Sequence, residues 1–324
     1  MPIPIRVVLI TAFEPDAGPV PGELRHWIDR NHLDTVLPFP QGYRDLRFNE
    51  QGVLAITTGV GAARAAASVM ALGLDPRFDL TYAFILINGI AGIDPVRGSL
   101  ASAVWCDTVV DGSFAHEIDA REIPQEWPDG FVPIGKSIPY EQPLAHRFNG
   151  DDGIVFRLNS KLSEWAFELS RDTELLDTPA MAERRAQFVP SEVANRKPYV
   201  LRGAELSSTT FWHGHLLSQR ARNWVNYQTE DTATYTITGM EDTGILQSLR
   251  FLADAGHIDF DRVLILRTAS NFDQQRTGIT AAESLAETKV ARYSAYLPAL
   301  ENAHRVGNVV VQALLALPDG DSPV

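Results

Sequence analysis

The sequence predicts an α/β fold in which helices cover both faces of a central sheet. Short aliphatic and β-branched runs bounded by turn residues are typical of buried strands. Segments with helical spacing lie between them, and this alternation of strand with helix indicates a layered domain. The predicted strands are Ile5–Ala12, Val53–Thr57, Tyr82–Asn88, Ser102–Val110 and Arg262–Thr268, and the predicted helices are Ala62–Leu72, Lys161–Ser170 and Thr243–Ala255.

We expect residues 1–324 to form one domain with a single irregular excursion. Residues from about 114 to 150 are rich in Pro, Gly and charged side chains and show no clear period, so they are predicted to leave the sheet without forming a second domain. The residues after Leu317 predict a frayed tail.

Composition disfavours several classes of protein. The formal net charge is −13 and no Lys/Arg block offsets it, so a nucleic-acid partner is not expected. The longest apolar runs fall well short of the roughly 18 residues of a membrane span. The N-terminal apolar run fits a first strand rather than a signal peptide, and Cys106 is the lone cysteine, so we expect a cytoplasmic protein.

Known catalytic motifs are missing from the sequence. It contains no GxSxG, no P-loop and no GxGxxG, which disfavours a serine hydrolase, a kinase and a dinucleotide enzyme. His213 and His215 have no further ligand at the spacing of a zinc hydrolase. We therefore expect no metal and no cofactor.

Ligands of open α/β sheets bind beyond the carboxyl ends of the strands, so the residues after each predicted strand are site candidates. Thr58 and Gly59 precede a helix, where backbone N–H groups can approach an anion or a ribose. The small residues of Asn88–Gly92 would let a flat ring lie against the backbone. Arg267–Asn271 includes an amide, which suits a purine because it both donates and accepts. The alternative is that the glycines only permit tight turns and the close packing of crossover connections.

Carboxylates follow two predicted strands. Thr234–Asp242 alternates like a strand and contains Glu241, whose carboxylate can accept hydrogen bonds from a sugar diol. N-capping of the next helix is the alternative role of Glu241. Glu14 and Asp16 follow the first strand, and a solvated turn is their alternative.

The blocks around these junctions resemble, closely and over nearly the whole chain, the purine nucleoside permease family within the nucleoside phosphorylase superfamily. The blocks that carry the resemblance are TTGVGAARAAASVMAL, INGIAGIDPVRGSLASA, HEIDAREIP, FRLNSKL, STTFWHG, ITGMEDTGILQSLR and VLILRTASNF. The resemblance implies a three-layer α/β/α sandwich around a mixed sheet, with a purine nucleoside held at the strand ends. Relatives are often dimers to hexamers, so it also implies a homo-oligomer.

The resemblance implies roles for individual residues as well. Glu241 with Met240 resembles a ribose-binding pair, and Asn271 after Ser270 resembles the purine-reading residue. The other implied substrate contacts are a base-stacking aromatic, Phe211 or Trp212, and a wall beneath the base, Gly89, Ala91 and Gly92.

Cleavage of the N-glycosidic bond is the implied chemistry. It proceeds through an oxocarbenium-like sugar, so Asn271 would stabilise the departing purine while a nucleophile lies beneath C1′. Phosphate as nucleophile requires cations, and here Ile87 and Ile90 stand where phosphorylases often carry arginine and a hydroxyl residue. The candidate substitutes for the missing phosphate ligands are Thr11, Thr58 and Arg64.

Three alternatives to phosphorolysis stand beside it. Related nucleosidases use water, and here Asp16 or Glu14 would activate it. The second alternative is a soluble protein that binds nucleoside without cleaving it and delivers it to a separate transporter. A former enzyme retained as a sensor is a third hypothesis.

Overall fold

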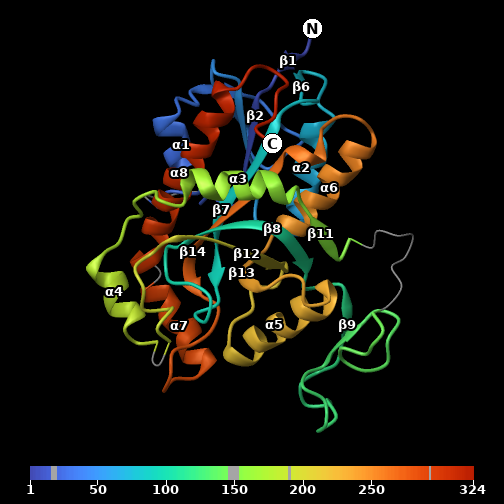
Figure 1. Cartoon of the computed structure of the whole chain (residues 1–324), viewed down its shortest axis with the longest axis vertical. Helices are drawn as coiled ribbons and strands as arrows, with labels where there is room; N and C mark the ends of the chain where they lie inside the picture. The colour runs from blue at the N-terminus through green and yellow to red at the C-terminus, as the bar shows by residue number, and fades with distance from the viewer. Residues whose placement is uncertain (16–19, 145–152, 189–190, 292) are drawn as a thin grey trace.

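A mixed ten-stranded sheet forms the centre of the structure, a computed structural model that describes residues 1–324 apart from 16–19, 145–152, 189–190 and 292 (Figure 1). In spatial order its strands are β11 (Val155–Arg157), β8 (Ala103–Asp111), β12 (Val200–Ser207), β13 (Tyr235–Gly239), β7 (Phe84–Ile93), β2 (Val7–Thr11), β5 (Val53–Thr57), β4 (Leu46–Phe48) and β3 (Thr35–Leu37), while β14 (Val263–Phe272) pairs with β7 and β8. Two short pairs lie outside this sheet: β1 (Ile3–Pro4) with β6 (Phe78–Asp79), and β9 (Ala115–Glu117) with β10 (Phe131–Pro133).

Helices cover both faces of the sheet, because the side chains of its buried strands alternate between two apolar clusters. Val7 and Leu9 of β2 belong to a cluster with residues of α1 and α8. Val8 and Ile10 belong to a cluster with residues of α2 and α6. The helices are α1 (Arg25–Arg30), α2 (Ala62–Gly73), α3 (Ser160–Ser170), α4 (Pro179–Arg185), α5 (His215–Thr229), α6 (Asp242–Asp254), α7 (Ala281–Ala291) and α8 (Tyr293–Ala316).

The strands and helices that the sequence predicts are all present, and all but Val53–Thr57 are shifted at one or both ends. The largest shift is in β7, which runs on to Ile93 beyond the predicted end at Asn88. It continues through Gly89 and Gly92 because β14 pairs in parallel with it from Ile85 to Ile93. The second candidate junction is therefore itself part of a strand.

One strand, β14, closes part of the sheet on itself. It pairs with β7 and β8, while β7 pairs with β13, β13 with β12, and β12 with β8. The last residues of β7 and β13 lie opposite each other, with Gly92 beside Thr238. The carboxyl ends of β7, β13 and β14 consequently meet in one place.

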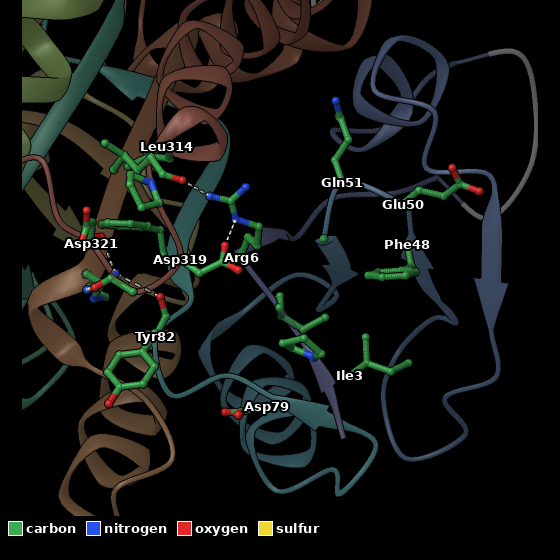
Figure 2. A pocket seen from close by; sticks show the side chains of 18 residues that line it. Ile3, Arg6, Phe48, Glu50, Gln51, Asp79, Tyr82, Leu314, Asp319 and Asp321 are labelled. Atoms are coloured by element: carbon green, nitrogen blue, oxygen red, sulfur yellow. Dashed lines mark hydrogen bonds and ion pairs between the residues drawn. The ribbon is translucent and has the colours of Figure 1, made fainter. Parts of the chain in front are cut away.

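The amino edge of the sheet contains a pocket of about 770 Å³, where the C-terminal segment is held (Figure 2). Arg6, just before β2, donates to the backbone oxygen of Leu315 at 2.7 Å and forms an ion pair with Asp319 at 3.2 Å. Arg262, just before β14, donates to the backbone oxygen of Asp321 at 3.0 Å. The prediction of a frayed tail is wrong as far as Asp321, because the guanidinium groups of Arg6 and Arg262 bind backbone carbonyl groups of the C-terminal segment.

The described part of the predicted excursion lies outside the ten-stranded sheet and packs against α5. The ring of Phe131 in β10 meets Trp224 of α5 edge to face at 4.6 Å, and the Tyr227 hydroxyl donates to the backbone oxygen of Glu141 at 2.8 Å. Figure 1 shows β9 and its neighbouring loops projecting beside α5. The last residues of the predicted excursion, from 145 on, lie outside the described part of the chain.

Candidate functional site

A cavity of about 490 Å³, called the site cavity below, lies at the carboxyl edge of the sheet, where β7, β13 and β14 end. Segments from both halves of the chain form its wall, including the loop after β2 and α8. The lining residues are Phe13, Pro15, Val20, Glu23, Val60, Ile90, Ala91, Gly92, Phe211, Thr238, Gly239, Met240, Glu241, Ser270, Asn271 and Tyr296.

Glu241 connects β13 to α6 and its side chain is almost fully buried. Its Oε1 accepts a hydrogen bond from the Gly61 N–H at 3.1 Å, and its Oε2 accepts one from the Met240 N–H at 3.3 Å. The carboxylate makes no capping bond to α6, so the N-capping alternative does not describe it. Burial raises the pKa of Glu241 to about 7, with Arg267 lowering it and Glu23 raising it.

Glu23 is a second buried carboxylate in the same wall, directly before α1. Its Oε2 accepts hydrogen bonds from the N–H groups of Ala12 at 2.7 Å and Phe13 at 2.9 Å, and its Oε1 accepts one from the Ile90 N–H at 2.8 Å. A carboxylate has about four acceptor positions, so roughly one remains free. Burial raises the pKa of Glu23 although Arg267 and these N–H groups lower it.

A β-bulge in β14 places Ser270 and Asn271 in the cavity wall. The pairing with β7 shifts register between Ala269 and Asn271, which leaves Ser270 as the extra residue. The Ser270 hydroxyl donates to the backbone oxygen of Ala91 at 3.2 Å and lies 3.0 Å from the Asn271 side-chain oxygen. The Asn271 amide nitrogen donates to the backbone oxygen of Phe272 at 3.0 Å. These contacts fix the amide at the edge of the site cavity.

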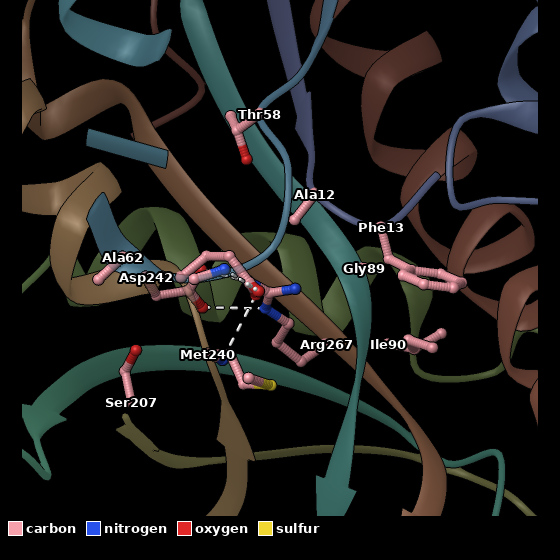
Figure 3. A network of polar contacts seen from close by, with 12 residues as sticks. Ala12, Phe13, Thr58, Ala62, Gly89, Ile90, Ser207, Met240, Asp242 and Arg267 are labelled. Carbon is pink, nitrogen blue, oxygen red and sulfur yellow. Dashed lines mark hydrogen bonds and ion pairs between the residues drawn. The ribbon is translucent and has the colours of Figure 1, made fainter. Parts of the chain in front are cut away.

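Arg267 lies buried behind the cavity wall, within a group of acidic side chains (Figure 3). Its Nε donates to Asp242 Oδ2 at 2.9 Å, and its Nη2 donates to Asp242 Oδ1 and lies 3.5 Å from Glu241 Oε2. Its Nε is 4.0 Å from Glu205 Oε2. Figure 3 shows Arg267 beside Asp242, with Met240 on the neighbouring turn.

The rest of the cavity wall is largely apolar. Phe13 and Tyr296 meet edge to face with ring centroids 6.1 Å apart, and the Tyr296 hydroxyl donates to the backbone oxygen of Pro21 at 2.6 Å. Phe211 is 53% exposed, so its ring is available to a ligand. Among the described lining residues there is no Lys, Arg or His. The wall therefore suits an uncharged ligand with aromatic and hydroxyl groups.

The structure brings together seven of the residues that the sequence singled out. They come from three strand ends and one loop, and all line the site cavity: Ala91, Gly92, Phe211, Met240, Glu241, Ser270 and Asn271.

The candidate phosphate ligands lie elsewhere. The Thr11 hydroxyl lies 3.1 Å from that of Thr57, and the buried Thr58 hydroxyl donates to the Gly59 backbone oxygen at 3.1 Å. Arg64 projects from α2 over the Tyr43 ring, 6.0 Å from its centroid. The N–H groups at the start of α2 are already bound, that of Gly61 to Glu241 and that of Ala62 to Thr209.

Three further candidates do not line the described cavity either. Trp212 is buried in an apolar cluster with Tyr235. Gly89 lies behind the wall beside Arg267, and the Glu14 carboxyl packs against the turn at Gly22. Asp16 lies outside the described residues.

Sequence reasoning missed Glu23, Phe13 and Tyr296. Glu23 stands just before a short helix, so locally it resembles an ordinary capping residue. Its partners, the N–H groups of Ala12 and Ile90, lie 11 and 67 residues away in the sequence. The one available signal was that an acidic residue precedes the first helix after the first strand.

Comparison with solved structures places this architecture in the class of nucleoside phosphorylase-like α/β folds. It is similar to the 5′-methylthioadenosine/S-adenosylhomocysteine nucleosidase of Neisseria meningitidis, with a TM-score of 0.54, 15% identity, and 95% of this chain and 99% of that chain covered. The futalosine hydrolase of Helicobacter pylori gives a TM-score of 0.53 at 11% identity, with 95% and 98% covered. These similarities confirm the α/β fold with a mixed central sheet.

The chain belongs to the purine nucleoside permease family, whose model matches residues 4–318. A probable purine nucleoside permease of Schizosaccharomyces pombe is 32% identical over 257 residues, which are 78% of this chain and 73% of the relative. The purine nucleoside permease of Candida albicans is 29% identical over 234 residues, 71% of this chain and 57% of the relative. The family resemblance seen in the sequence is thereby confirmed.

No helix among the described residues is long and apolar enough to cross a membrane. No group of three or more His, Cys, Asp or Glu in this part of the chain is placed to hold a metal ion.

Proposed function

We propose that the chain binds a purine nucleoside in the site cavity. The observation that carries the proposal is that Glu241, after β13, and Ser270 and Asn271, in β14, face one cavity of about 490 Å³. Glu241 would accept hydrogen bonds from the ribose diol, and the amide of Asn271 would bind the purine. Phe211 would stack on the base, with Ala91 and Gly92 beneath it. The family to which the chain belongs supports a purine nucleoside as the ligand.

The charge of the wall supports a nucleoside rather than a nucleotide. Glu23 and Glu241 are the charged residues among those described in the lining. A 5′-phosphate would meet carboxylates without a compensating cation, and like charges in a partly buried site repel. The unphosphorylated ligand is therefore favoured.

We further propose that the bound nucleoside is hydrolysed, with Glu23 as general base. The free acceptor position of Glu23 would take a water proton while the water oxygen bonds to C1′ and the bond from C1′ to the purine breaks. The electron pair passes to the purine, which Asn271 hydrogen-bonds and which takes up a proton to leave as the neutral base. A carboxylate whose pKa is raised by burial is a better base near neutral pH.

Glu23 also supports water over phosphate as the nucleophile. The N–H groups of Ala12, Phe13 and Ile90 converge as an anion-binding site would require, and the chain's own carboxylate occupies them. Arg64 and the Thr11 hydroxyl do not line the described cavity. Phosphorolysis would have to displace Glu23 from three hydrogen bonds.

Binding without cleavage is the second candidate function. It is favoured by the names of the similar yeast proteins, which are purine nucleoside permeases rather than hydrolases. On this hypothesis the same cavity holds the nucleoside, and Glu23 has a purely structural role.

One experiment separates these functions. Purified protein is incubated with inosine, guanosine or adenosine, with and without phosphate, and free base is measured by chromatography alongside calorimetric binding. Base release without phosphate supports hydrolysis, and release that requires phosphate contradicts the role of Glu23. Tight binding without release supports the second candidate, and absence of binding for all three nucleosides contradicts both.

A further inference from the structure

Arg267 faces four carboxyl groups that come from three separate segments of the chain. Asp242 and Glu241 start α6, Glu205 belongs to β12, and Arg267 itself belongs to β14. A Cβ added to Gly89 would touch both Arg267 Nη1 and Glu23 Oε1, so Glu23 is the fourth carboxyl beside this guanidinium. Arg267, Asp242 and Glu205 are almost completely shielded from solvent, and Glu23 and Glu241 are each only 5% exposed.

Asp242 anchors the guanidinium. It accepts hydrogen bonds from both Nε and Nη2 of Arg267, a bidentate arrangement that fixes the plane of the side chain. Nη2 also lies 3.5 Å from Glu241 Oε2, and Nη1 lies beside Gly89 on the side where Glu23 Oε1 is found. No donor among the described residues reaches either oxygen of Glu205, and burial together with Asp242 raises its pKa well above the usual range. Glu205 is thus the member that keeps its proton.

Charge counting shows why the guanidinium matters to the site cavity. Glu205 is neutral and Asp242 is paired to Arg267. The carboxylates of Glu23 and Glu241 therefore both depend on this one guanidinium for a nearby positive charge. Arg267 lowers the pKa of each, while Glu23 raises that of Glu241. Two carboxyls in this relation titrate as a pair.

We propose that Arg267 is a positioning residue, which orients the two carboxylates of the site cavity and links their ionisation. The inference rests on the proposed function, because it is the nucleoside that requires Glu241 ionised for its diol and Glu23 available for a water. A substitution of Arg267 or of Asp242 is therefore expected to change the ionisation of both Glu23 and Glu241.

Charged and polar groups from several elements face Glu241 within the part of the chain that the structure describes. They are Glu23 before α1, the Gly61 N–H before α2, the Met240 N–H after β13, Asp242 of α6 and Arg267 of β14, with Glu205 of β12 and Cys106 of β8 behind them. The Cys106 thiol is buried and its pKa is raised well above the usual range, so it stays neutral. Burial has the largest influence on the pKa of Glu241 and raises it; Arg267 lowers this pKa, and the acidic neighbours Glu23 and Asp242 raise it.

The test measures the Glu241 titration directly, without a nucleoside. Full-length protein labelled with δ-¹³C-glutamate is titrated by NMR, and the Glu241 signal is assigned by its loss in Glu241→Gln. Arg267→Lys keeps a charge but withdraws it from the pair, so the midpoint should rise by about one pH unit. Asp242→Asn combined with Glu205→Gln leaves Arg267 to the cavity carboxylates, so the midpoint should fall by about one unit.

The matched control is a second bidentate pair remote from the site cavity, Arg185 with Asp177, at 2.7 and 2.9 Å. Arg185→Lys and Asp177→Asn should leave the Glu241 midpoint unchanged. Midpoints within about 0.3 unit of wild type in both Arg267-cluster variants would overturn the proposal, whereas shifts of opposite sign support it. The asparagine–glutamine variant is close to isosteric and serves if Arg267→Lys does not fold.

Nucleoside binding by the same proteins separates this inference from the proposed function. Calorimetry from pH 5.5 to 8.5 should show wild-type affinity rising with pH, with the midpoint displaced in each variant as in the NMR titration. If the NMR midpoints shift but no nucleoside binds to any of the proteins, the proposed function is contradicted. The effect of Arg267 on the ionisation of Glu241 is then still supported.

Discussion

The two edges of the sheet each contain a cavity, and they differ in what their charged groups bind. At the amino edge, Arg6 and Arg262 are bound to carbonyl groups of the C-terminal segment, and the partner carboxylate of Asp319 is 91% exposed. At the carboxyl edge, Glu23 and Glu241 are buried and bound to backbone N–H groups. The amino-edge pocket is larger, about 770 Å³ against about 490 Å³.

This difference shows that volume alone does not identify a binding site. The amino-edge guanidinium groups hold the chain's own end, a contact that solvent screens in part. The buried carboxylates of the carboxyl edge keep an acceptor position toward the cavity, where desolvation makes each hydrogen bond to a ligand count for more. Function is therefore expected at the smaller cavity.

The largest effect should come from Glu23→Gln. Loss of the general base should lower base release by about 100-fold or more, with nucleoside affinity changed only a few-fold. Chromatography of products measures the first and calorimetry the second. Glu50→Gln, at the wall of the amino-edge pocket, is the matched control and should retain wild-type turnover. Equal turnover in the two variants would remove the functional contrast between the edges.

Glu241→Gln should weaken nucleoside binding by roughly 10- to 100-fold, since a charge-assisted acceptor contributes about 1.5–3 kcal/mol. Because burial raises the pKa of Glu241 to about 7, wild-type affinity should rise as the pH increases through that value, and the variant should lose this rise. A 2′,3′-dideoxynucleoside should bind both proteins equally. A normal affinity of Glu241→Gln for inosine would argue against a diol at this position.

Asn271→Asp should change base preference by about tenfold, equivalent to roughly 1.4 kcal/mol. The amide can donate to the carbonyl of a 6-oxopurine, whereas a carboxylate can only accept and so favours a 6-amino group. The ratio of inosine to adenosine affinity, measured by calorimetry, checks this. Ser270→Ala removes only the neighbouring hydroxyl and should shift the ratio less. An unchanged ratio in Asn271→Asp would place the base elsewhere.

The smallest effect is expected at the amino edge. Arg6→Ala removes the hydrogen bonds to Leu315 and Leu317 and the ion pair with Asp319, and should lower the Tm by about 2–4 °C. Nucleoside affinity should stay as in wild type. A tenfold loss of affinity in this variant would show that the two edges are coupled after all.

Most of the sheet could be predicted from sequence because buried parallel strands carry their own signal. The aliphatic runs of β2, β5 and β14 stand out locally. The strand β12 did not, since its partly exposed first residues interrupt the apolar pattern, and α5 has a largely polar surface. The end of β7 was set too early because two glycines, which usually break a strand, are here held by pairing with β14.

The residues of the candidate site likewise fall into those that a local sequence pattern predicts and those that it does not. Glu241 and Asn271 follow strands, so the rule for strand ends found them. Glu23 gains its position from N–H groups on two separate strands, and Tyr296 reaches the cavity from α8, close to the other end of the sequence. Such long-range contacts leave no local pattern in one sequence.

The amino-edge contacts also bring Ile3 and Asp321 to the wall of one pocket, on the side of the sheet away from the site cavity. A tether attached at either terminus would therefore hold the molecule with its ligand entrance facing outward. Immobilisation on a sensor surface, or fusion to a reporter through a short linker, should leave nucleoside access unobstructed.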